Sequence, residues 1–290
     1  MPLRKLFFFL IPFALSADIV PKETAPQSAK HAPLDQTSPL CYITPPKGWE
    51  IAASKNLSKS VQIAFFKKTS SSFSPSINLA VEKSTLSLQE YLKVIRKIHE
   101  ADHRNRWRQL GKVHTQAGIG QLTEIDTTTE WGSIRMLQLI VVKHGHAYVI
   151  TAAASKEDMA QYYKEFQTTF RTLQVTSDLI GAIPQMQRRE SLQLESEHLL
   201  SAWQDLLSTS AKEASSFNDP AFQKAHWIPF QNKVIQDYED MGAHWQVLVL
   251  KAIQENMLSL MSPCEEAPSL QNPEVAKLPE QTEIETKEEI

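Results

Sequence analysis

The stretch that decides the fold is residues 118–154, GIGQLTEIDTTTEWGSIRMLQLIVVKHGHAYVITAAA. Three runs rich in apolar and β-branched residues, 119–129, 133–143 and 147–154, alternate with the short sequences Glu130-Trp131-Gly132 and His144-Gly145. β-rich runs joined by such short Gly-containing turns are typical of hairpins. The stretch therefore predicts three consecutive strands that pair as an antiparallel meander.

Further strands and two helices are predicted on either side of the meander. The strands are expected at 42–43, 61–67, 76–83 and 110–115, where β-branched and aromatic residues gather. Ser87 and Glu90 have the spacing of a capping box, and apolar residues recur at helical spacing from Leu88 to Ile98. A second helix is expected after Ser155, which we interpret as its N-cap, with an apolar stripe from Met159 to Leu173. This order of elements predicts an α+β fold in which helices pack on an antiparallel sheet.

The sequence loses its β character after Thr176 and becomes helical. Apolar residues recur in 183–215 and again in 227–261, and the break at 216–220 ends in Asp219-Pro220, where a new helix can start. We interpret 177–262 as a helical hairpin. Trp227, Val234, Met241 and Leu248 recur every seven residues, the spacing of a coiled coil. Two helices cover only one side of such a stripe, so its remaining apolar surface must contact the first domain, a second copy or another protein.

Both ends of the chain are predicted to lie outside these folded regions. Residues 1–16 combine Arg4 and Lys5 with an apolar run and an A-x-S ending, the pattern of a secretory signal peptide. Residues 17–40 are rich in proline and predict a disordered linker. Residues 263–290 hold eight glutamates, two lysines and four prolines, which predict a disordered acidic tail. The sequence thus favours a periplasmic or secreted protein with folded regions at 41–176 and 177–262.

Three motifs of the first folded region resemble the Mog/PsbP/DcrB-like superfamily. They are YITPPKGW at 42–49, SLQEYL at 87–92 and KHGHAYVITA at 143–152. Together they extend the resemblance over about 41–175, a little under half of the chain. The resemblance implies an α/β/α sandwich around an antiparallel sheet and a role in binding proteins or supporting assemblies. It implies no catalytic chemistry, and it does not cover the helical region. Many bacterial relatives are lipoproteins, whereas Cys41 lies too far beyond the apolar run to be a lipid anchor.

Composition narrows the classes of partner. The net charge is −3, so no excess of lysine and arginine is present to neutralise the phosphates of a nucleic acid. Beyond residue 16 no apolar run is long enough to cross a membrane. The two cysteines, Cys41 and Cys264, either pair in an oxidising compartment or remain free thiols.

One motif suggests catalysis by zinc. His99-Glu100-Ala101-Asp102-His103 matches HExxH, in which two histidines one helical turn apart bind zinc and the glutamate activates water. The apolar stripe of the preceding helix, however, places Glu100 nearly opposite the buried side, and Arg104 and Arg106 follow. Glu124 and Glu130 are candidate third ligands, with no geometric reason to choose between them. We interpret the motif as a polar helix end.

Two further sets of residues have competing interpretations. His144 and His146 are either metal ligands or part of a hairpin turn, and the turn is favoured. Trp203, Trp227 and Trp245 are either core residues of the helices or anchors of a protein interface, which makes them the candidate partner-binding residues.

The sequence favours a non-enzymatic envelope protein that works without a cofactor and binds a protein partner or a second copy. The alternative is a zinc-dependent peptidase that uses His99, Glu100 and His103.

Overall fold

The computed structural model of the chain describes residues 40–53, 57–209 and 217–261. The predicted signal peptide, the predicted linker up to residue 39, the acidic tail and Cys264 lie outside the described residues. The elements of the first half are β1 (Leu40–Tyr42), β2 (Glu50–Ile51), β3 (Val61–Phe66), β4 (Ser76–Lys83), α1 (Leu88–Glu100), β5 (Arg106–Thr115), β6 (Gly118–Thr129), β7 (Gly132–Lys143), β8 (His146–Ser155), α2 (Met159–Arg171) and β9 (Gln174–Thr176). The second half contains α3 (Met186–Thr209), α4 (Pro220–Phe222), a π-helix (Gln223–Trp227), α5 (Ile228–Asp237), a 3-10 helix (Glu239–Met241) and α6 (Ala243–Ser259).

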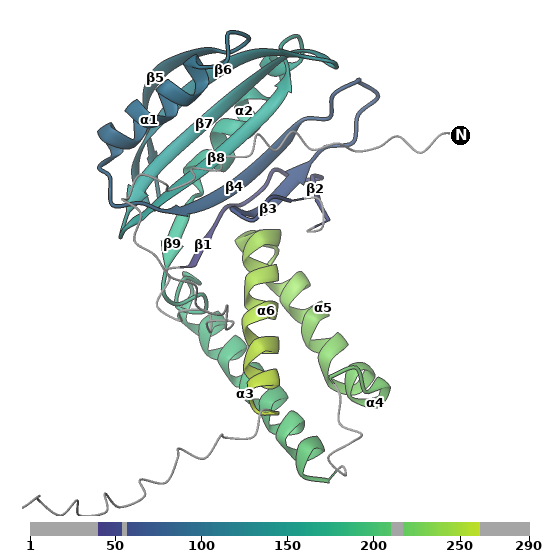
Figure 1. Cartoon of the computed structure of the whole chain (residues 1–290). Coiled ribbons are helices and arrows are strands. Elements are labelled where there is room, and N and C mark those ends of the chain that lie inside the picture. The colour runs from purple at the N-terminus through teal and green to yellow at the C-terminus, as the bar shows by residue number, and fades with distance from the viewer. Residues whose placement is uncertain (1–39, 54–56, 210–216, 262–290) are drawn as a thin grey trace, which may run out of the picture.

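Seven antiparallel strands form one sheet in the order β2-β3-β4-β8-β7-β6-β5 (Figure 1). The predicted meander is confirmed, because β6 pairs with β7 and β7 with β8, so that Ile140 lies between Gln121 and Val149. His144 and Gly145 form a two-residue turn with φ of 50° and 73°, the left-handed conformation that such hairpins require.

Helices cover both faces of this sheet (Figure 1). Alternate residues of a strand point to opposite faces, so Ile140 packs under α1 while its neighbour Leu139 packs against α2. The predicted capping box at Ser87 and Glu90 is present at the start of α1. The expected N-cap of α2 is displaced, because the helix begins after Asp158 and Ser155 instead accepts a hydrogen bond from the Asp158 amide at 3.0 Å. The predicted α/β/α sandwich is confirmed.

The second half contains three long helices in the described residues, so the prediction of a two-helix hairpin is wrong. The chain expected to form one helix over 227–261 is broken between α5 and α6, where Gly242 has φ of 86°. The side-chain Nε2 of Gln246 then donates hydrogen bonds to the backbone carbonyls of Ile235 and Tyr238, which lie at the end of α5. The apolar residues that recur every seven positions therefore lie in separate elements and do not form one coiled-coil helix.

The three helices share an apolar core that contains two fully buried tryptophans. Trp203 of α3 and Trp245 of α6 have no exposed surface. Their indole N–H groups donate to the carbonyls of Met257 and Leu179, at 2.7 and 2.9 Å. These hydrogen bonds satisfy the polar atom of each ring inside the core.

β1 connects this helical core to the sandwich. It pairs antiparallel with β9, and its residues alternate, so that Cys41 packs in the core of the sandwich and Tyr42 in the core of the helices. At the start of α6, His244 accepts a hydrogen bond from the Ile43 amide at 3.2 Å and packs its ring against Phe65. The helices therefore pack on the sandwich, one of the arrangements that the sequence left open.

The buried His244 makes stability depend on pH. Burial lowers the pKa of His244 to about 3, from an ordinary value of 6.5. The unfolded chain therefore binds more protons between these values, and the free energy of unfolding falls as the pH drops from 6.5 towards 3. The loss reaches at most about 1.4 kcal/mol per pH unit. Chemical denaturation at pH 7, 6 and 5 should show a shallower dependence in His244→Asn, which retains an acceptor near Nδ1. An equal dependence in both proteins would contradict the assignment.

Trp245 is expected to be a core residue of the helices. Trp245→Ala should lower the free energy of unfolding by about 3–5 kcal/mol, because it leaves a cavity and an unpaired Leu179 carbonyl. Trp245→Phe keeps a ring in place and should cost less. Urea titrations of the three proteins measure both effects. An alanine variant as stable as the parent protein would show that Trp245 is not packed as described.

Candidate functional site

The HExxH residues do not form a zinc site in this structure. α1 ends at Glu100, so His103 lies beyond the helix and is exposed. His99 belongs to the last turn of α1, and its side chain is buried. Glu100 forms an ion pair with Arg96 at 2.8 Å on the exposed side. Burial lowers the pKa of His99, an effect opposed by a hydrogen bond with Gln138, so its imidazole is neutral at pH 7. The two histidines do not share a helical face, which is what the zinc motif needs.

The other candidate ligands are also apart. His146 forms a hydrogen bond from its Nδ1 to the carbonyl of His144 at 2.9 Å, as part of the β7–β8 turn. Glu124 forms ion pairs with Arg108 and Arg135. Within 40–53, 57–209 and 217–261, no three side chains of His, Cys, Asp or Glu are close enough together to hold a metal ion.

Cys41 is enclosed in the core of the sandwich. Burial raises the pKa of its thiol to about 12, so the thiol is protonated at neutral pH and is a poor nucleophile. Its possible pairing with Cys264 concerns a residue outside the described part of the chain.

All three candidate tryptophans lie in the helical core. Trp203 and Trp245 are fully buried, and Trp227 packs between Phe217 and Phe230. Their side chains thus stabilise the helices, and in this structure they are not exposed to a partner.

The exposed apolar side chains lie elsewhere on the helices. Of the fourteen large apolar residues that are exposed among the described residues, eight belong to the second half, six on its helices and two directly after α6. They are Met186, Leu194, Ile228, Ile235, Val247, Leu258, Leu260 and Met261.

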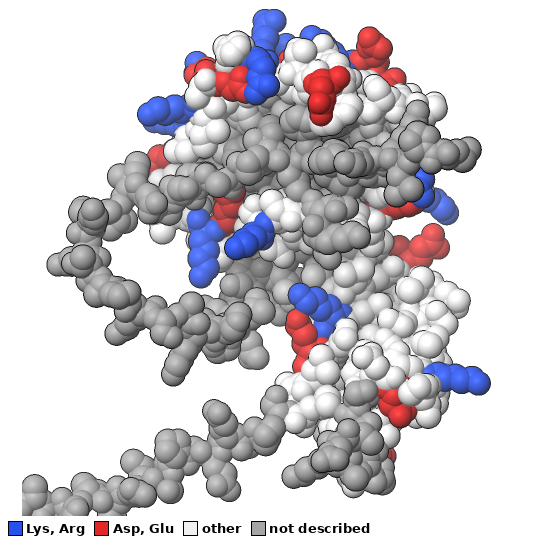
Figure 2. All heavy atoms as spheres, turned by 45° about the vertical axis from the view of Figure 1, so that its right-hand side comes forward, with Lys and Arg blue, Asp and Glu red and all other residues white. Residues whose placement is uncertain are grey.

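One continuous side of α5 exposes only uncharged residues. Ile228 and Ile235 are 45% and 51% exposed and lie two turns apart on the same side of the helix. Pro229, Asn232 and Gln236 are also exposed there. The charged residues of α5 are Lys233, which is half-buried in an ion pair with Glu195, and Asp237, which is exposed at the last position of the helix. We call the five exposed uncharged residues the α5 surface. Figure 2 shows Lys, Arg, Asp and Glu side chains scattered over both the upper and the lower part of the visible face.

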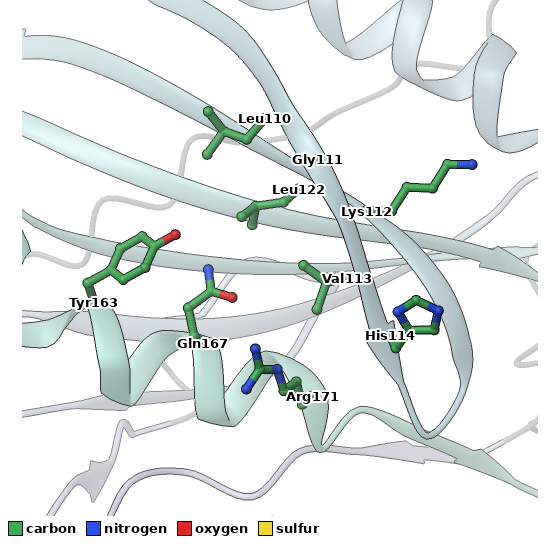
Figure 3. Close-up of a pocket in the computed structure, with 9 residues that line it drawn as sticks. All are labelled: Leu110, Gly111, Lys112, Val113, His114, Leu122, Tyr163, Gln167 and Arg171. Atoms are coloured by element: carbon green, nitrogen blue, oxygen red, sulfur yellow. The ribbon is translucent and has the colours of Figure 1, made fainter.

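A groove lies between β5 and α2. It has a volume of about 380 Å³ and is lined by Leu110, Gly111, Lys112, Val113, His114, Leu122, Tyr163, Gln167 and Arg171. Tyr163, Gln167 and Arg171 are spaced four residues apart on α2 and point towards the strands, whereas Lys112 and His114 extend away from the helix (Figure 3). The carbonyls of Arg171 and Leu173 accept hydrogen bonds from Gln116 and Ala117, which join the end of α2 to the β5–β6 turn.

Sequence reasoning missed both the α5 surface and the groove. The α5 surface carries a sequence signal, because Ile228 lies two positions before the buried Phe230 and Ile235 lies one position after the buried Val234, so both isoleucines fall outside the buried stripe of α5. The groove depends on β5 lying at the sheet edge beside α2, and no local pattern predicts that arrangement.

No protein-family model matches the chain, and no curated protein matches its sequence. None of the helices within the described residues is long and apolar enough to span a bilayer.

Solved structures with a similar arrangement of elements include three proteins of different origin. LpqN of Mycobacterium tuberculosis, involved in cell envelope biogenesis, is 10% identical, with 48% of this chain and 84% of that chain covered and a TM-score of 0.36. Cyanobacterial PsbP from Synechocystis sp. PCC 6803 is 11% identical, with 51% and 98% covered and a TM-score of 0.35. The Ran-binding protein Mog1p of Saccharomyces cerevisiae is 14% identical, with 46% and 89% covered and a TM-score of 0.34.

These structures include a PsbP-type and a Mog-type protein, the types that the three sequence motifs resemble. Identities of 10–14% and TM-scores of 0.34–0.36 carry no information about the activity or partners of this chain. The chain is similar to these three solved structures in its arrangement of helices and strands.

Proposed function

We propose that this chain is an exported, non-enzymatic protein that binds a protein partner through the α5 surface. The observation that carries the proposal is the exposed, uncharged side of α5, with Ile228 and Ile235 at its centre. Centres of protein interfaces are depleted in charged residues, and apolar side chains there lose contact with water on binding. Single exposed apolar residues are ordinary, whereas a continuous uncharged stripe favours a contact surface.

The packing of the helices supports this role. α5 is held from its inner side by Phe230 and Val234, which are buried in the core, and by the hydrogen bonds from Gln246. Its outer side is thus presented by a fixed helix, and a partner can bind there without rearranging the core. Export is supported by the pattern of residues 1–16.

The alternative of a zinc peptidase has less support. It requires His99 and His103 to point into one site, whereas the structure buries the first and exposes the second beyond the end of α1. The candidate third ligand Glu124 is already paired with two arginines.

Replacing both isoleucines of the α5 surface should weaken binding without unfolding the protein. Ile228→Lys/Ile235→Lys places two charges where a partner would bury apolar area, which should reduce affinity by at least about tenfold. Complex formation is measured by sedimentation for self-association, and by quantitative co-purification from the producing cells for other partners. The melting temperature of the variant should stay close to that of the parent protein.

Ile98→Lys is the matched control, because Ile98 is an isoleucine 40% exposed on α1, in the other half of the molecule. It adds a charge to a helix without touching the α5 surface. Equal loss of binding in both variants, or unchanged binding in the double variant, would contradict the proposal.

The metal content tests the alternative directly. Purified protein should contain far less than one zinc per chain by elemental analysis, because His99 and His103 do not share a helical face. His103→Ala should leave this content and the stability unchanged, since the side chain is exposed. Stoichiometric zinc that is lost in His103→Ala would restore the peptidase hypothesis.

A further inference from the structure

We propose that the groove between β5 and α2 binds residues 280–290 of the same chain as an added strand. This site is distinct from the α5 surface, and the proposal does not depend on the function proposed above.

The backbone of β5 is open to such pairing. β5 is the last strand of the seven-stranded sheet, so one of its two edges has no neighbouring strand among the described residues. An unpaired edge presents N–H and C=O groups to which an extended segment can add. A bulge at Leu110 interrupts the regular pairing with β6 and leaves this side chain 42% exposed at the groove.

The inside of the groove combines apolar walls with an unsatisfied donor. Leu110, Val113 and Leu122 form its apolar part, and a Cβ placed on Gly111 would meet no atom within 4 Å. The side-chain nitrogen of Gln167 is buried and has no hydrogen-bond partner among the described residues. A buried amide donor without an acceptor costs free energy, which an incoming carbonyl or carboxylate would recover.

The charge of the groove favours an acidic segment. Lys112 and Arg171 are among its lining residues, Arg171 on the α2 side and Lys112 on β5 extending away from the helix, and no aspartate or glutamate lines the groove. Neither Lys112 nor Arg171 forms an ion pair within the part of the chain that the structure describes. Cations without partners attract carboxylates, most strongly at low ionic strength.

The sequence of residues 280–290, EQTEIETKEEI, matches these features. It contains five glutamates and one lysine, and it follows the last proline, Pro279, so every backbone N–H in it can donate. Thr282, Ile284 and Thr286 alternate with Glu283 and Glu285. In an extended strand this alternation places β-branched side chains on one face and carboxylates on the other.

Residues 262–279 connect the last described helix to this segment. Residues 262–279 can extend over roughly 60 Å, at about 3.3 Å per residue.

Hydrogen–deuterium exchange of the full chain tests the proposal. Reversing three charges of the segment, Glu283→Lys/Glu285→Lys/Glu288→Lys, should speed exchange of the amides in 109–114 by at least about tenfold, because an added strand would no longer protect them. Arg171→Glu should have the same effect. The matched control, Glu265→Lys/Glu266→Lys/Glu274→Lys, reverses as many charges outside the segment and should leave exchange unchanged.

Each other outcome overturns the proposal. Unchanged exchange at 109–114 after reversal of 283, 285 and 288 shows that the segment does not occupy the groove. An equal effect of the control shows a general effect of charge. Protection that rises with protein concentration shows that the segment comes from a second copy, which contradicts binding within one chain.

Discussion

The arrangement of the whole molecule depends on the contact between the start of α6 and the strand that enters the sandwich. Gly242 approaches Thr44 so closely that a Cβ at residue 242 would lie 2.9 Å from the threonine side chain. Two residues later, the His244 ring is buried against Phe65 and accepts a hydrogen bond from Ile43. The positive φ of Gly242 ends the preceding helical turn, and the absence of a side chain permits this approach. This glycine therefore determines both where α6 begins and how closely the helices pack on the sandwich.

Several further contacts depend on this junction. Trp245, next to His244, bonds to Leu179 just after the last strand of the sandwich, and Gln246 bonds to the end of α5. Three consecutive residues thus fix α6 against the sandwich, the start of the helical half and α5. The α5 surface is therefore part of an ordered arrangement rather than of an isolated helix. It lies at the opposite end of the molecule from β5 and the groove (Figure 1). Two binding events at these places would not compete for the same surface.

The sequence predicts most of the sandwich because its signals are local. The capping box at Ser87 and the turn at His144-Gly145 depend only on nearby residues, and both are present. The start of β5 was missed because Arg106 and Arg108 resemble a loop, whereas on an edge strand Arg108 stays at the surface and pairs with Glu124.

The helical half was harder to predict because its determinants are distant in sequence. Apolar spacing alone predicts one continuous helix where the structure has α5 and α6. The break between these two helices depends on the approach of Gly242 to Thr44, which lies almost 200 residues earlier in the chain. Spacing also does not distinguish a buried tryptophan from an exposed one, because each is apolar in the pattern. In the structure the three tryptophans are core residues. The exposed stripe of α5 can be recognised only once the elements that pack against the other side of this helix are known. The groove likewise joins α2 to a strand more than 40 residues before it.

The central claim is that a protein partner contacts the α5 surface in the producing cell. A photo-crosslinking amino acid at position 235, with position 98 on α1 as the reference, tests it most directly. We expect irradiation of intact cells to join position 235, but not position 98, to one defined protein or to a second copy. Identical crosslinking patterns at the two positions, or no crosslinked protein at position 235, would contradict the account.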